Sequence, residues 1–219
     1  MIHGAVAAAA LLALGVANAA GPVKSAATGV SPAVKLMPAA VLYDQNDNAG
    51  ANGITSQNFE ASFDAYDAMA ADNFTVPAGS KWLVNQVSLT GSYSATGGAT
   101  TAHVTFYKNK ANLPAAVVAD YPAAVITTDS AGSFVITVPK TTLKPGTYWV
   151  GVSANLDFAV GGQWYWTGRT LQAGVDAAWK NPGDGFGTGC TAYAPLATCI
   201  PATFDPDLMF AIGGKAKPI

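Results

Sequence analysis

The stretch TTAHVTFYKN, residues 100–109, decides the fold class of this chain. Two sets of side chains alternate along it: His103, Thr105 and Tyr107 in one set, and Ala102, Val104 and Phe106 in the other. Successive side chains of a β-strand point to opposite faces, so this period of two is typical of a strand. The stretch therefore predicts a β-strand with one face against a core.

Comparable runs recur along the chain and are separated by turn residues such as the Pro and Gly of 75–80 and 142–149. We expect further strands at 40–44, 70–76, 81–93, 123–128, 132–139, 146–154, 162–168 and 207–213. No run predicts a long helix. The pattern indicates an all-β protein, an antiparallel jelly-roll-like β-sandwich of about 8–9 strands.

One segment, residues 57–69, is ambiguous. Phe59, Phe63 and Tyr66 have the spacing of one helix face, although a long loop could dock the same side chains. A short helix and a docked loop are therefore both open.

The start of the chain has the features of an export signal. Residues 4–17 form an uncharged apolar run, and Ala17-Asn18-Ala19 offers the small-x-small pattern of a cleavage site. The run is too short for a comfortable membrane span. We expect a signal peptide at 1–19, a tail or linker at 20–38 and one β-sandwich domain at 39–219. The mature protein is then secreted, extracellular or periplasmic, with no membrane span.

Composition excludes some classes of partner. Charged residues make up 11% of the chain, and its formal net charge is −2. The basic residues are scattered singly, so no stripe exists to neutralise phosphates or anionic head groups. We therefore expect no nucleic-acid partner, no membrane-surface partner and a monomeric protein.

The two cysteines, Cys190 and Cys199, are nine positions apart in a stretch rich in Gly, Pro and Thr. An exported chain meets an oxidising compartment, which favours a local disulfide. A metal site is the competing interpretation, but there is no CxxC motif and no histidine nearby.

Several runs together carry a resemblance: AADNFTVPAGSKWLVNQVSLTG at 70–91, GSFVITVP at 132–139, LKPGTYWVGVSA at 143–154 and DLMFAI at 207–212. With these runs, residues 40–213 resemble a jelly-roll-like module of secreted bacterial proteins. The resemblance implies a fold similar to that of carbohydrate-binding β-sandwiches and a bacterial extracellular location. It implies no defined activity.

The sequence lacks the common catalytic motifs. There is no HExxH, no G-x-S-x-G and no Walker loop, and His103 is the only histidine after the expected signal peptide. The remaining enzymatic alternative is a small glycoside hydrolase, which needs two carboxylates across a sugar. Asp64 and Asp67 would be close on one helix turn. We expect a protein that is not an enzyme and requires no cofactor.

Acidic residues also suggest a structural calcium site. Asp44 and Asp47, in the loop YDQNDNAGANG, supply the hard oxygen ligands that Ca²⁺ prefers. By analogy with jelly-roll binding modules, Asp205 or Asp207 would lie near them, where the first and last strands meet. Solvated Asx turns explain the same residues, so both interpretations are open.

The stretch GGQWYWTGRT, residues 161–170, is the candidate ligand site. Period-two geometry places Trp164 and Trp166 on one face of a strand. If that face points inward, the tryptophans belong to the core; if it points outward, they form a flat strip for sugar rings, with Arg169 and Trp179 as neighbours. Flanking glycines favour an edge strand.

These observations lead to a functional hypothesis. We expect a secreted, non-catalytic binding module that recognises polysaccharide or a cell-surface glycan through an aromatic strip. The alternative is a structural or adhesive extracellular protein that acts through protein contacts.

Overall fold

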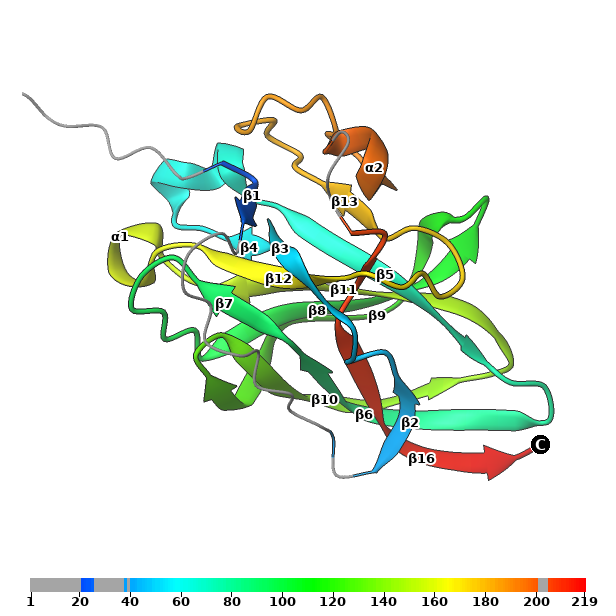
Figure 1. Ribbon diagram of the computed structural model, residues 1–219. Coiled ribbons are helices and arrows are strands. Elements are labelled where there is room, and N and C mark those ends of the chain that lie inside the picture. Colours follow the sequence, from blue (N-terminus) through cyan, green and yellow to red (C-terminus); the bar gives the residue numbers. More distant parts are fainter. Residues whose placement is uncertain (1–20, 26–37, 39, 201–204) are drawn as a thin grey trace, which may run out of the picture.

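The computed structural model describes residues 21–25, 38, 40–200 and 205–219. The expected signal peptide, at 1–19, lies outside these residues. The described chain is all-β and mostly antiparallel, with two sheets and three short helices (Figure 1). No helix among the described residues is long and apolar enough to cross a membrane.

The smaller sheet has five strands. Four follow the order β1 (Val23–Ser25), β3 (Ala49–Thr55), β12 (Trp164–Arg169) and β15 (Asp207–Leu208), and β7 (Gly91–Tyr93) also pairs with β12.

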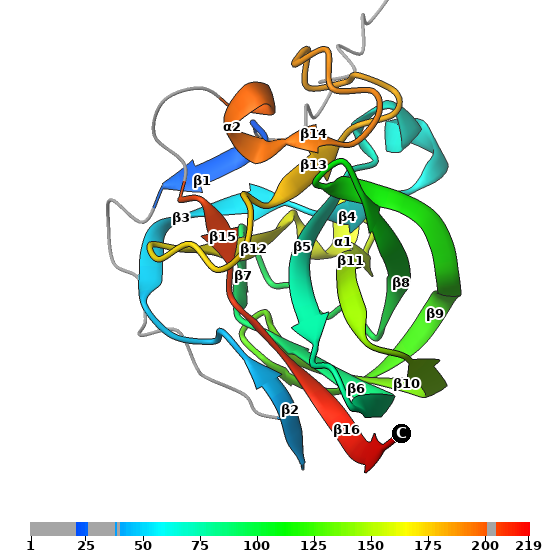
Figure 2. The same cartoon turned by 90° about the vertical axis from the view of Figure 1, so that its right-hand side faces the viewer.

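The larger sheet has eleven strands. Ten follow the order β14 (Ala194–Pro195), β13 (Ala178–Lys180), β5 (Met69–Val76), β11 (Gly146–Asn155), β8 (Thr101–Lys110), β9 (Leu113–Ser130), β10 (Ser133–Leu143), β6 (Ser80–Leu89), β16 (Phe210–Pro218) and β2 (Val41–Asp44). The short strand β4 (Gln57–Asn58) pairs in parallel with β11. The sheet curls so far that β5 and β11 face β6 and β16 across the interior (Figure 2).

The expected all-β fold class is confirmed, and the strand count is higher than expected. The described residues contain sixteen strands, several of them only two or three residues long. β3 was missed because its sequence, AGANGIT, is rich in Gly and Ala and has little hydrophobic alternation. β1 falls within the expected tail. Backbone hydrogen bonds to β3 hold it there, with Val23 opposite Ile54, and such bonds require no apolar pattern.

The core lies between the curled sheet and the smaller sheet. Alternate residues of β8 enter it as the period-two pattern predicts: Val104 and Phe106 are completely buried, whereas His103 is half-buried on the outer face. The outer face of β5, β8, β11 and β13 carries a second, small apolar group of Ala71, Tyr107, Trp149 and Ala178. Both faces of these central strands are therefore partly covered.

The ambiguous segment 57–69 contains a 3₁₀ helix, η1 (Ala61–Tyr66). Two other short helices are α1 (Phe158–Gly161) and α2 (Leu196–Cys199). The predicted disulfide is confirmed: Cys190 and Cys199 are bonded, with their Cα atoms 5.8 Å apart. It ties the loop after β13 to α2.

Candidate functional site

The three tryptophans expected in an aromatic strip lie in the interior. Trp164, Trp166 and Trp179 have no exposed surface. Each indole N–H donates to a backbone carbonyl: Trp164 to Gly132 at 2.7 Å, Trp166 to Met209 at 2.8 Å and Trp179 to Thr55 at 2.8 Å. The inward alternative is therefore the correct one, and these side chains form no exposed platform.

The position of β12 explains why. The flanking glycines suggested an edge strand, but β12 lies between β3 on one side and β7 and β15 on the other. Trp164 stacks on Phe134 of the larger sheet with ring centroids 4.9 Å apart. The two tryptophans thus contact the opposing sheet, where burying such large rings stabilises the sandwich most.

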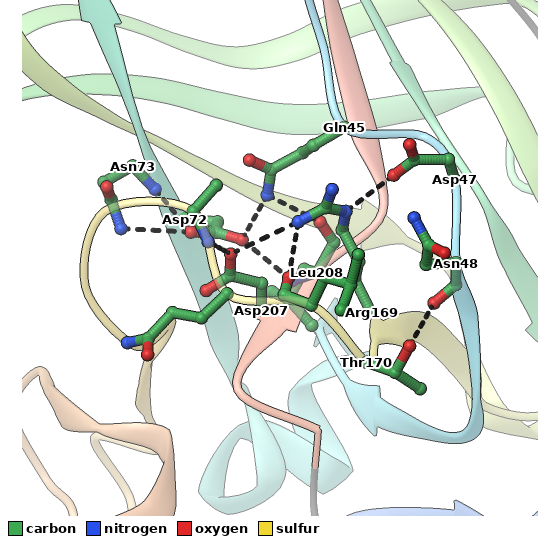
Figure 3. Close-up of polar contacts among 12 residues, drawn as sticks. Gln45, Asp47, Asn48, Asp72, Asn73, Arg169, Thr170, Asp207 and Leu208 are labelled. Atoms are coloured by element: carbon green, nitrogen blue, oxygen red, sulfur yellow. Dashed lines mark hydrogen bonds and ion pairs between the residues drawn. The ribbon is translucent and has the colours of Figure 1, made fainter.

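Arg169, expected beside that platform, is in a largely buried polar cluster between the sheets (Figure 3). Its Nε donates to Oδ1 of Asp47 at 2.8 Å, and its Nη1 lies 3.9 Å from Oδ2 of Asp207. Nη1 also donates to the carbonyl of Leu171. The guanidinium therefore links the β2–β3 loop, the end of β12 and the start of β15.

Two carboxyl groups of the cluster, Asp72 and Asp207, are completely buried. Asp72 accepts hydrogen bonds from Gln45 Nε2 at 2.7 Å and from the Leu208 N–H at 2.8 Å. Burial, with the charge of Asp207 nearby, raises the pKa of Asp72 well above its usual value, and burial raises that of Asp207 to about 6. Oδ1 of Asp207 is buried without a hydrogen-bond partner. The pair therefore favours a bound proton.

The three residues expected at a calcium site are arranged differently. Asp47 and Asp207 both face Arg169, and Oδ1 of Asp44 accepts the Asn46 N–H at 2.8 Å, as in an Asx turn. Among the described residues, no group of three or more His, Cys, Asp or Glu side chains is arranged to hold a metal ion. Calcium binding stays a prediction, which melting with and without EGTA tests.

An aromatic surface does exist, at the end of the sandwich that carries α1 and η1. It consists of four half-buried rings, which we call the aromatic rim: Phe63, Tyr66, Phe158 and Phe186. Neighbouring ring centroids are 5.4 Å apart for Phe158 and Phe63, 5.9 Å for Phe63 and Tyr66, and 5.2 Å for Tyr66 and Phe186. The rim is thus a continuous series of rings with part of its surface exposed.

A shallow pocket of about 280 Å³ adjoins the rim. Phe59, which packs against Phe63 and Phe158, lines it together with polar residues. The complete lining is Asn58, Phe59, Gly98, Thr100, Asn155, Leu156, Asp157 and Val160. The pocket thus places amide, hydroxyl and carboxylate groups beside the apolar side chains of Phe59, Leu156 and Val160.

Side-chain hydrogen bonds from distant segments fix the rim. Glu60 accepts the backbone N–H groups of Phe158 at 2.6 Å and Ala159 at 3.3 Å, which joins η1 to α1. Nδ2 of Asn181 donates to the Ala65 carbonyl at 2.7 Å, and the Gly185 N–H donates to the same carbonyl. These bonds dock the loop that carries Phe186 onto η1.

The carboxylate pair expected for a hydrolase, Asp64 and Asp67, lies on this rim. Asp67 accepts the Phe59 N–H at 2.7 Å. Burial raises the pKa of Asp67 to about 6, against the lowering effect of that hydrogen bond, and the charge of Asp64 adds to the rise. Asp64 is exposed. This difference between Asp64 and Asp67 could not be predicted from the sequence, because it depends on how η1 docks.

His103 also has an acidic partner, on the outer face of the larger sheet. Its Nε2 lies 2.7 Å from Oδ1 of Asp120, which accepts the Thr105 hydroxyl as well at 2.6 Å. His103 is half-buried, and Asp120 is exposed to solvent. The group lies on the outer face of the larger sheet.

Sequence reasoning missed part of the rim. The spacing of Phe59, Phe63 and Tyr66 was the signal for one half of it. Phe158 and Phe186 are single aromatic residues in loop-like stretches, and nothing in the sequence places them beside η1.

Comparison with known proteins adds no relative: no family model, no curated protein and no solved structure matches the chain.

Proposed function

We propose that this protein is a secreted, non-catalytic binding module of jelly-roll-like fold that recognises a polysaccharide or cell-surface glycan at the aromatic rim. The observation that carries the proposal is the continuous series of half-buried rings beside the pocket. In this proposal the rim, and not Trp164 and Trp166, is the aromatic surface on which sugar rings pack.

The rim has the chemistry that sugar rings require. The C–H faces of a pyranose are apolar and pack flat on aromatic rings, whereas its hydroxyl groups need hydrogen-bond partners. Phe63 and Phe158 supply ring surface, and the pocket is lined by the polar side chains of Asn58 and Thr100. A series of several rings can contact successive sugar units, so it suits a polymer better than a single sugar.

The test is retention on insoluble polysaccharides and on a glycan array. We expect Phe63→Ala to lower retention at least tenfold, since both its neighbours in the rim lose their contact. Tyr121→Ala is the matched control, because Tyr121 is also a half-buried aromatic residue but lies in β9. Equal retention of both variants and the wild type would refute the proposal.

Failure to retain any glycan would favour the alternative, a structural or adhesive protein that acts through protein contacts. Pull-down with extracellular proteins of the same source, compared for wild type and Phe63→Ala, would then be the next measurement.

A second candidate function, glycoside hydrolysis, is favoured by one observation. Asp67, with its raised pKa, and Asp64, which is exposed, are two carboxyl groups with different environments on the same surface. Such a difference is how one carboxyl becomes an acid and its neighbour a base or nucleophile. This function predicts release of reducing sugar that Asp67→Asn and Asp64→Asn each abolish while retention on the polymer persists.

A further inference from the structure

The rim and its pocket are surrounded by carboxylates. Glu60 and Asp64 belong to η1 or precede it, Asp67 follows it, and Asp157 precedes α1. Two of them already serve the fold: Glu60 accepts the N–H groups of α1, and Asp67 accepts the Phe59 N–H. Asp64 and Asp157 remain exposed.

No basic side chain neutralises these two carboxylates within the part of the chain that the structure describes. The ion pairs found there join His103 to Asp120 and Arg169 to Asp47 and Asp207. Lys180, the closest lysine in sequence to the Phe186 loop, lies with its Nζ 4.7 Å from the Tyr193 ring centroid. The rim therefore presents negative charge next to aromatic ring surface.

We infer that the rim selects a polymer of amino sugars whose free amino groups are protonated. The inference rests on the proposed function and names its ligand class. Charge complementarity carries it: an ammonium group gains from a carboxylate beside it and from the face of an aromatic ring. Asp157 lines the pocket, and Asp64 lies in the same turn as Phe63.

The same charges act against other polymers. A polymer of uronic acids, or one carrying sulfate or phosphate, would bring anions against Asp64 and Asp157, and like charges across an interface are unfavourable. A neutral polymer would use the rings but leave the carboxylates without a role. Preference among three forms of one backbone therefore tests the effect of the charge, and the variants Asp64→Asn and Asp157→Asn separate that effect from the other differences among the forms.

The experiment compares poly-N-acetylglucosamine, its deacetylated form and a carboxymethylated form at about pH 6, where free amines are largely protonated. We expect the order of affinity to be deacetylated, acetylated, carboxymethylated. Asp64→Asn and Asp157→Asn should each weaken binding of the deacetylated form about two- to fivefold, and each should weaken binding of the acetylated form by a smaller factor. Asp176→Asn, in the β12–β13 loop, is the matched control.

Ionic strength gives a second readout. Binding of the deacetylated form should weaken when salt is raised from about 0.05 to about 0.5 M, because surface charges are then screened, while binding of the acetylated form should hold.

The outcomes separate the two proposals. If the acetylated form binds and Phe63→Ala abolishes this binding, but the deacetylated form binds no better and ignores Asp64→Asn, the charge inference is overturned and the glycan function stands. If no form binds, both are overturned. Preference for the carboxymethylated form would also overturn the charge inference.

Discussion

Two groups of aromatic residues in this protein have similar chemistry and opposite surroundings. Trp164 and Trp166 lie in the middle of the smaller sheet with no exposed surface, and each indole N–H has a backbone acceptor. Phe63 and Phe158 lie on a 3₁₀ helix and a short α-helix at the end of the sandwich and are half-buried. The sequence suggests the first group as a ligand surface, but in the structure only the second group is in part exposed to solvent.

The difference follows from where each group is attached. A strand with neighbours on both edges must turn one face to the opposing sheet, so large side chains on that face are buried. A single helical turn at the end of a sandwich has only one side covered. Aromatic residues crowded into a strand therefore indicate core, and those in short connecting helices indicate surface for recognition.

The largest expected effect comes from the buried group. Trp164→Ala removes a stacked ring and leaves the Gly132 carbonyl without its indole donor. We expect the free energy of unfolding to fall by about 3–5 kcal/mol, which urea denaturation would measure. If the variant instead kept its stability and lost only glycan retention, Trp164 would belong to the binding surface and not to the core.

Removal of the disulfide tests how firmly the aromatic rim is held. Replacing both Cys190 and Cys199 by Ser removes the constraint on a short loop and should cost about 2–3 kcal/mol. Limited proteolysis should then cut the chain near 181–199 before any other segment, since docking of Phe186 depends on this loop. Cleavage that begins instead at the β9–β10 hairpin would show that the disulfide has no special effect on the rim.

Carboxyl groups at the rim and between the sheets should make the free energy of unfolding depend on pH. The pKa values of Asp67, at the rim, and Asp207, between the sheets, are both raised from 3.8 to about 6. Each folded-state pKa lies above the unfolded one, so the added stability is fully present below pH about 4 and is lost as pH rises through about 6.

We therefore expect the free energy of unfolding to be higher at pH about 5 than at pH about 7.5, by an amount on the order of 1 kcal/mol. Asp67→Asn and Asp207→Asn should each flatten part of this slope in urea titrations at several pH values. If neither substitution changes the slope, other groups cause the pH dependence, and Asp72 is the first of them to examine.

The smallest expected effect concerns the hairpin that holds the acceptor of Trp164. Ala131 and Gly132 connect β9 to β10 with φ values of 52° and 98°. Asn tolerates positive φ better than Ala, and Asn-Gly is the preferred pair for such a turn. Ala131→Asn should raise the free energy of unfolding by a few tenths of a kcal/mol, up to about 1 kcal/mol, and leave retention unchanged. A lower melting temperature would contradict this interpretation of the turn.

The fold class could be read from the sequence because alternation in β8, β10 and β11 is local. Strands such as β3 and β13 could not, since Gly, Ala and short length leave no period, and only pairing with neighbours defines them. The cysteine pair was predictable from its spacing and expected compartment. The inward orientation of Trp164 was not, because it depends on whether β12 has neighbours on both edges.

The rim was predictable only where its residues are close in sequence. Phe63 and Tyr66 share one turn, whereas Phe158 reaches them through tertiary packing, with 95 positions between Phe63 and Phe158. The polar cluster around Arg169 could not be predicted from the sequence either. Arg169 was noted as a neighbour of aromatic residues, but its contacts with Asp47 and Asp207 arise where three distant segments meet.

The hydrogen bonds that Glu60 accepts from the backbone N–H groups of α1 have a consequence for ligand-induced stabilisation. They join surfaces contributed by segments 98 positions apart, so any molecule that bridges Phe63 and Phe158 binds the native chain and cannot bind an unfolded one with equal strength. A true ligand should therefore raise the temperature of the whole cooperative transition in proportion to the logarithm of its concentration, and a thermal-shift screen can search for it without any assumption about its identity.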